Sequence, residues 1–88
     1  MSDLTAMPNI GREMARKLAA AGITSAGALT ALGAEEAYLR LRLLYPKVCL
    51  VHLQAIEGAV RGIPFQFLPE ERKRELKTFH DGLGQAAP

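Results

Sequence analysis

The residues best suited to bind a ligand lie in one short segment near the N-terminus, residues 7–18. A proline and a glycine there predict a tight loop that opens directly into a helix, because proline fixes one backbone dihedral and glycine permits the close turn. The free amides and the dipole at a helix start favour an anion such as a phosphate. The candidate phosphate-binding residues combine loop backbone with nearby positive charge: Asn9, Gly11, Arg12, Arg16 and Lys17.

The same loop also has a purely structural interpretation, as a helix start packed under the N-terminus. Its pattern is similar to the helix-hairpin-helix element, which binds nucleic-acid backbone without reading sequence. A good backbone binder of that kind has glycine at both loop positions, whereas Asn9 occupies the first one here. Asparagine nevertheless tolerates the left-handed conformation better than most residues. The residues therefore leave both interpretations open, a phosphate-binding loop and a structural turn.

A surplus of apolar residues marks the helix expected at 34–45. Leu39 and Leu43 lie one turn apart there, offset from the stripe that would face a core. With the two tyrosines of the same helix they supply more apolar surface than one core needs. Exposed apolar surface of this kind marks interaction sites. The pair therefore predicts a surface for a protein partner or a homodimer, unless the link at 63–67 buries it.

A run of charged residues follows Pro69, but its signs are mixed. Basic residues at 72–74 and 77 are interleaved with glutamates at 70, 71 and 75, so favourable and unfavourable pairs share helical faces. The pattern is typical of a solvated helix face. A second nucleic-acid contact is the alternative interpretation.

The sequence contains no recognisable catalytic or metal-binding pattern. Cys49 and His52 supply only two ligands, whereas a structural zinc site needs four, and Cys49 is expected to be a small core residue. No Ser-His-Asp set, Walker loop or dinucleotide-binding glycine pattern occurs. We therefore expect no enzymatic activity, no cofactor, no metal and no small-molecule substrate.

Composition favours one small globular domain. The chain has 88 residues, of which 49% are apolar, and its 11 basic and 9 acidic residues give a net charge of +2. This charge permits a nucleic-acid partner without demanding one. A single cysteine fits a reducing cytoplasm. No signal peptide and no apolar run near the ~20 residues of a membrane span is present, so we expect a cytoplasmic protein.

Glycine and proline divide the chain into about five short helices, expected at residues 10–21, 25–32, 34–45, 50–61 and 69–80. No stretch alternates as a strand would. The predicted fold is therefore all-α, a compact bundle with a helix-hairpin-helix-like N-terminal half, followed by a flexible tail at 81–88. The predicted core draws on all five helices: Ile10, Met14, Leu18, Ile23, Leu29, Leu32, Leu41, Leu50, Leu53, Ile56, Val60, Leu76 and Phe79.

Five segments carry a resemblance to a known family: Met-Pro-Asn-Ile-Gly at 7–11, Ala-Gly-Ile-Thr at 21–24, Leu-Gly-Ala-Glu-Glu-Ala-Tyr at 32–38, Ala-Ile-Glu-Gly-Ala-Val-Arg-Gly-Ile at 55–63 and Leu-Pro-Glu-Glu-Arg-Lys-Arg-Glu-Leu at 68–76. In their order and spacing they resemble the C-terminal domain of the TfoX/Sxy competence regulators, as one domain over residues 4–80. The resemblance implies a small all-helical domain akin to helix-hairpin-helix and sterile-alpha-motif folds. It also implies a role in regulating DNA-uptake genes alongside other proteins.

The chain departs from that family in three ways. Larger members carry an additional N-terminal domain, for which this sequence has no room. The link at 63–67 has Pro64, Phe65 and Phe67 where the family tends to place a His-Trp-polar pattern. Cys49 stands where a hydroxyl residue would cap the following helix, and a thiol caps poorly.

Two hypotheses of function follow from the sequence. In the first, the domain is a nucleic-acid-binding regulatory module that grips the phosphate backbone of duplex DNA through residues 9–17, without base readout. In the second, it is an adaptor or oligomerisation module that binds protein through the 34–45 helix and the 63–67 link, without direct DNA contact.

Overall fold

The computed structural model describes residues 3–86, and these form helices without a strand. The elements in chain order are η1 (Leu4–Ala6), α1 (Arg12–Ala20), α2 (Ala26–Leu32), α3 (Ala34–Leu44), α4 (Leu50–Arg61), η2 (Phe65–Phe67) and α5 (Glu70–Ala86), where η is a single 3₁₀ turn. The predicted all-α class and the five predicted α-helices are confirmed. None of these helices is long and apolar enough to cross a membrane.

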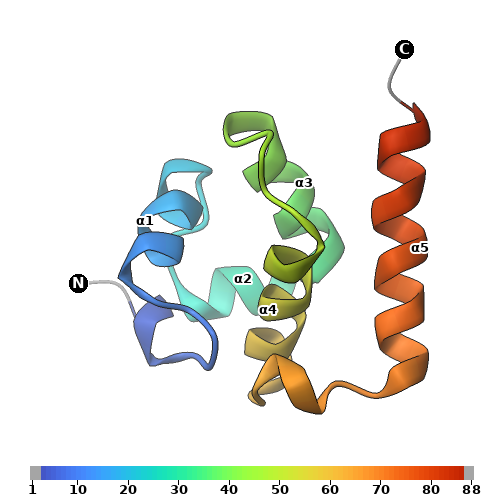
Figure 1. Cartoon of the computed structure of the whole chain (residues 1–88). Helices are drawn as coiled ribbons and strands as arrows, with labels where there is room; N and C mark the ends of the chain where they lie inside the picture. Colours follow the sequence, from blue (N-terminus) through green and yellow to red (C-terminus); the bar gives the residue numbers. More distant parts are fainter. Residues whose placement is uncertain (1–2, 87–88) are drawn as a thin grey trace.

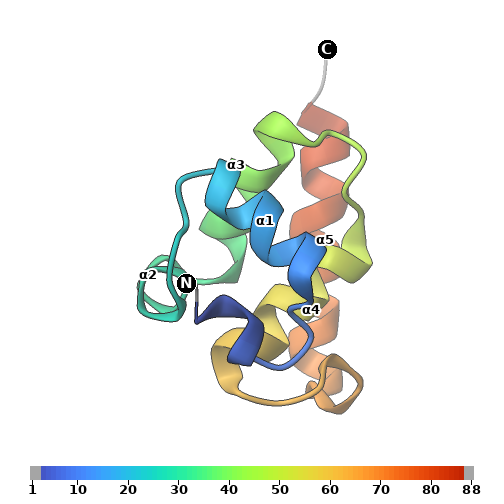
Figure 2. The same cartoon turned by 90° about the vertical axis from the view of Figure 1, so that its left-hand side faces the viewer.

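Helices α3 and α4 form the centre of the bundle. They pack against each other, while α1 and α5 lie on opposite sides of this pair (Figure 1). The view turned by 90° shows the same order, with α1 in front and α5 behind (Figure 2). The start of α1 and the long α5 are therefore separated by the central helices.

Local signals explain most of the helix boundaries. Ser25 caps α2, because its hydroxyl oxygen accepts a hydrogen bond from the amide of Ala28 at 3.0 Å. Gly62 closes α4 in the left-handed conformation, with φ of 76°. Helix α1 begins at Arg12 rather than near residue 10, because Gly11 before it has an extended backbone. The predicted start of this helix was therefore two residues too early.

The core contains every residue that the sequence predicted for it. Most of these side chains are buried, and five half-buried ones pack against the others: Met14, Leu32, Leu50, Val60 and Phe79. The structure adds Leu4, Tyr38, Val48 and Leu68 to the buried set. These four lie outside the clearest helical stripes, so periodicity alone did not select them.

Tyr38 corrects one of the sequence interpretations. It was counted with the surplus apolar surface of α3, but its side chain is fully buried. Its hydroxyl donates a hydrogen bond to the carbonyl oxygen of Val48 at 3.0 Å, which satisfies the buried polar atom. Burial raises the pKa of this phenol above its ordinary value.

Arg72 fastens α5 to the central helices through an ion network. Its Nη2 lies 3.0 Å from Oε1 of Glu57 in α4 and 2.9 Å from Oε1 of Glu35 in α3. Glu57 is only 5% exposed and also pairs with Arg61. Burial raises the pKa of Glu57, but the two guanidinium groups outweigh it, so the pKa lies below its ordinary value. The interpretation of 72–74 as a solvated face is therefore wrong for Arg72.

Helix α5 extends beyond the end that the sequence predicted for it. The prediction placed that end near His80, with a tail over 81–88, whereas the helix continues to Ala86. Two interactions explain the extension: Lys77 pairs with Asp81 at 2.8 Å, and Leu83 packs against the core. These contacts outweigh the low helix propensity of Gly82. The last two residues of the chain lie outside the described residues.

Candidate nucleic-acid interface

The loop that leads into α1 is anchored by the side chain of Asn9. Its Nδ2 donates hydrogen bonds to the carbonyl oxygens of Ile63, at 3.0 Å, and Ala55, at 3.3 Å, and its Oδ1 accepts one from the amide of Phe65 at 3.1 Å. The residue has φ of 69°, the left-handed conformation that asparagine tolerates. Since these bonds occupy the side chain, Asn9 positions the loop, and only its backbone is left to meet a ligand.

Gly58 makes room for this anchor. A Cβ at residue 58 would lie 2.5 Å from Nδ2 of Asn9 and 2.7 Å from the carbonyl oxygen of Ile63. Any larger side chain on this face of α4 would therefore push the loop away. The Asn9–Gly58 contact joins two segments that the family resemblance had singled out separately.

The first turn of α1 presents backbone amides without a side-chain cap. Gly11 is the N-cap residue, and the first amide bonded inside the helix is that of Ala15, to the carbonyl oxygen of Gly11 at 2.9 Å. A hollow of about 380 Å³ opens beside this turn, lined by Gly11, Arg12, Glu13, Met14, Lys17 and His52. Uncapped amides and the positive end of the helix dipole make such a hollow favourable for an anion.

The three cationic residues predicted for this site differ in their surroundings. Arg12 is exposed and forms no ion pair within the described part of the chain. Arg16 is paired with Glu13 through Nη2, and this pairing lowers the pKa of the glutamate. Nζ of Lys17 lies over the ring of Tyr45, 5.3 Å from its centroid. Arg12 therefore keeps the most available positive charge at the start of α1.

His52 is a member of the hollow that the sequence did not predict. It comes from the first turn of α4, and its Nδ1 accepts a hydrogen bond from the amide of Cys49 at 3.1 Å. Burial, and then the charge of Lys17, lower the pKa of this imidazole. With Nδ1 accepting, the ring proton is assigned to Nε2. The signal that could have revealed His52 is its position three residues after the helix cap, where side chains reach back to the cap amide.

Cys49 corrects a second expectation. It was predicted to be a small core residue, but it is exposed at the N-cap of α4. Its own amide is satisfied by the imidazole of His52 rather than left to solvent. The described residues bring together no group of three or more ligand side chains that could hold a metal.

The predicted partner surface on α3 forms a groove. Leu39, Arg42, Leu43 and Pro46 line a hollow of about 360 Å³ near the end of this helix. Leu43 is 84% exposed, whereas Leu39 is half-buried. The alternative, burial of this pair beneath the 63–67 link, is therefore wrong for Leu43. Within the link, Phe65 packs against the core and Phe67 is 73% exposed.

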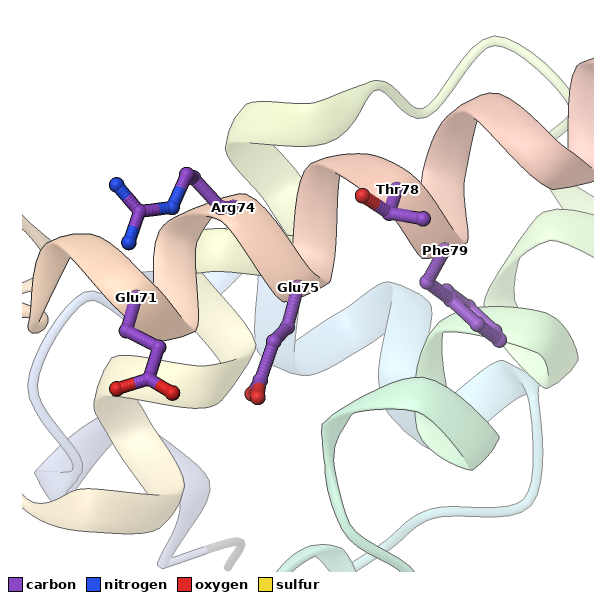
Figure 3. Close-up of a pocket in the computed structure, with 5 residues that line it drawn as sticks. All are labelled: Glu71, Arg74, Glu75, Thr78 and Phe79. Carbon is purple, nitrogen blue, oxygen red and sulfur yellow. The ribbon is translucent and has the colours of Figure 1, made fainter.

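A third hollow, of about 590 Å³, lies along α5 (Figure 3). The carboxylates of Glu71 and Glu75 point to one side of the helix with the ring of Phe79, whereas Arg74 points to the other side. Charges of both signs thus flank this stretch without converging on one point. This agrees with the mixed-charge pattern of the sequence and gives the hollow little selectivity for an ion.

The fold and these surfaces define a small all-helical module whose exposed features are suited to binding. Residues 1–80 match the family described as the TfoX C-terminal domain, and the chain belongs to this family. It is 36% identical over 77 residues to Protein Sxy of Escherichia coli (strain K12). The aligned residues make up 88% of this chain and 37% of that protein. The chain thus spans little more than a third of the length of this curated relative.

Solved structures from Listeria monocytogenes share the fold. A crystal structure of an uncharacterized protein in a triclinic form has a TM-score of 0.91 and 42% identity, covering 92% of both chains. A tetragonal form of a protein of unknown function has a TM-score of 0.88 and 42% identity, covering 90% of this chain and 98% of that one. The predicted family resemblance is therefore confirmed by the family match and by the Sxy relative.

Proposed function

We propose that this domain is a non-enzymatic regulatory module of competence-related gene control that binds the phosphate backbone of duplex DNA. The observation that carries the proposal is the hollow beside the first turn of α1. There, uncapped amides lie together with the unpaired guanidinium of Arg12 and the ring of His52. A protein that binds duplex DNA in this role is expected to be cytoplasmic.

Each group has a defined part in this proposal. The amides that follow Gly11 donate hydrogen bonds to a phosphate oxygen, and Arg12 adds a charge-assisted contact. Lys17, His52 and the Glu13 side chain, which is paired with Arg16, also line the hollow. Because Asn9 is committed to the fold, the loop contributes position rather than a side-chain contact. Contacts of this kind position a protein on the duplex without reading bases.

Binding through so few groups should be weak and strongly dependent on salt. Each neutralised phosphate contributes a slope of about −0.9 to log affinity against log salt, so we expect a slope of roughly −2 to −4. The measurement is fluorescence anisotropy of a labelled duplex at low and moderate salt. The double variant Arg12→Glu with Arg16→Glu should lose binding, because it reverses two charges beside the phosphate site.

A matched control separates this site from general positive charge. Arg74→Glu, compared with the single variant Arg12→Glu, reverses one exposed charge on α5 that has no ion partner among the described residues, and it should leave DNA affinity nearly unchanged. Absence of binding by the unmodified protein at low salt would refute the proposal. Equal loss in the Arg74 variant would show non-specific attraction instead of a site at α1.

A second candidate function, a protein-interaction module, is favoured by one observation. Leu43 exposes 84% of its surface beside the groove that it shares with Leu39. Large exposed apolar side chains grouped in a hollow are typical of docking sites. This function would use the end of α3 and is compatible with DNA binding at the start of α1.

A further inference from the structure

The groove at the end of α3 has the shape of a helix-docking site. Leu39 and Leu43, one turn apart on α3, line it together with Pro46, which lies two residues beyond the end of this helix. Leu39 and Leu43 are four residues apart on α3, a rise of about 6 Å, which matches two apolar side chains one turn apart on a partner helix. Leu44, next to Leu43 in the chain, is 52% exposed and widens the apolar area.

Positive charge also lies at the groove and next to it in the chain. Arg42 lines it, and Lys47 follows in the adjacent turn. Neither cation forms an ion pair or hydrogen bond within the described part of the chain. The two glutamates at the start of α3, Glu35 and Glu36, are by contrast each paired with an arginine. The end of α3 therefore keeps unneutralised positive charge next to apolar surface.

We propose that this groove binds an amphipathic helix of a partner protein that carries two apolar residues one turn apart, flanked by aspartate or glutamate. The inference rests on the second candidate function and adds the chemistry of the partner. Burial of apolar side chains against Leu39 and Leu43 supplies the affinity. Carboxylates facing Arg42 and Lys47 select the partner and speed its approach.

Charge argues against two other occupants. A second copy of this chain, docked on a two-fold axis, would bring the same patch against itself and Arg42 close to its own equivalent. Such like-charge juxtaposition is unfavourable. A DNA backbone would meet three apolar side chains and two cations, so most of the groove would gain nothing from the contact. An acidic amphipathic helix can contact both the apolar side chains of the groove and its positive charge.

The test uses two synthetic peptides of about 18 residues, long enough to form a helix. One carries leucines one turn apart flanked by glutamates, and the other has each glutamate replaced by lysine. Binding of the labelled peptides to the complete chain is measured by fluorescence anisotropy. We expect the acidic peptide to bind about tenfold more tightly than the lysine peptide. Leu43→Asp should abolish binding of both peptides, because it puts a charge on the apolar lining of the groove.

Charge reversal tests the partner chemistry directly. Arg42→Glu should weaken the acidic peptide about tenfold and reverse the preference toward the lysine peptide. Arg74→Glu, an equal charge change on α5, should leave both affinities unchanged. Each variant is checked for its helical circular dichroism and melting temperature. Exposed Arg42 makes no bond that the substitution would break, so the variant should fold.

The other outcomes separate this inference from the function on which it rests. Equal binding of both peptides, lost with Leu43→Asp, would keep the protein-interaction function and overturn the acidic partner. Absence of binding by either peptide would overturn both. Loss of DNA affinity in Arg42→Glu would make the groove a DNA contact and overturn the inference. A dimer of the free chain that Leu43→Asp dissociates would identify a second copy as the occupant.

Discussion

The start of α1 and the end of α3 are both exposed ends of helices, yet they offer a ligand different chemistry. The first presents backbone amides with Arg12 and His52, and hydrogen bonds of the Asn9 side chain fix the loop before it. The second presents leucine side chains with Arg42, and nothing in the described residues covers Leu43. The first therefore depends on a backbone geometry built by distant contacts, whereas the second depends on side chains that one helix supplies.

This difference predicts how each surface responds to mutation. Damage to the anchor of the α1 loop should impair only the first surface, while damage to the network around α3 should destabilise the whole bundle. Mutations that leave the fold intact should separate the two activities. Three substitutions, from the largest expected effect to the smallest, test this division.

The substitution with the largest expected effect is Arg72→Met. It removes the guanidinium that joins Glu57 of α4 to Glu35 of α3. A buried carboxylate that loses a partner is costly, and since Glu57 keeps Arg61 we expect a loss of about 3 kcal/mol in the free energy of unfolding. Urea denaturation followed by circular dichroism measures it. Lys77→Met, which breaks an exposed pair with Asp81, is the control and should cost much less than Arg72→Met.

The same network predicts a dependence on acid. The pKa of Glu57 is lowered from 4.5, so its stabilisation is present above pH 4.5 and is lost as pH falls through the lower folded value. Arg72→Met should make the stability of the domain less dependent on pH in that range. An unchanged acid profile in the variant would show that other carboxylates dominate.

An intermediate effect is expected from Gly58→Ala. The new methyl group would collide with Nδ2 of Asn9 and with the carbonyl oxygen of Ile63, so the loop must move. Overpacking of this kind costs about 1–3 kcal/mol. DNA affinity should fall, while peptide binding at the α3 groove should remain.

Gly82→Ala is the matched control for that substitution. A Cβ at residue 82 has no neighbour within 4 Å, and the residue is helical, so alanine should stabilise the domain by about 0.5–1 kcal/mol. Thermal unfolding compares the stability of the two variants, and fluorescence anisotropy compares their DNA affinity. Retained DNA affinity in Gly58→Ala would separate the phosphate site from its proposed anchor.

The smallest effect is expected from Cys49→Ser. Serine is a better N-cap residue than cysteine, so its hydroxyl should stabilise α4 by about 0.5–1 kcal/mol. For a domain of this size that raises the melting temperature by roughly 2–8 °C. Calorimetry measures the shift, and both binding activities should stay unchanged. A lower melting temperature would mean that contacts of the thiol outweigh the gain in capping.

The candidate sites were predicted from the sequence in unequal measure. Leu39 and Leu43 were found because they lie one turn apart on one helix, and this spacing brings their side chains together whatever the rest of the fold does. His52 and Arg42 were missed as members of the two hollows. His52 reaches its site from another helix. Arg42 is a candidate binding residue because it lines the groove and has no ion pair among the described residues, and only the structure shows both.

The sequence by itself determined the five helices, the core stripes and the resemblance to the family. These depend on helical periodicity, on glycine and proline at the boundaries, and on backbone preferences, all of which are local. The tertiary structure decided the side-chain bonds of Asn9, the burial of Tyr38 and the network of Arg72. Each of these joins residues from different elements, and their pairing depends on how the helices pack, which no local pattern encodes.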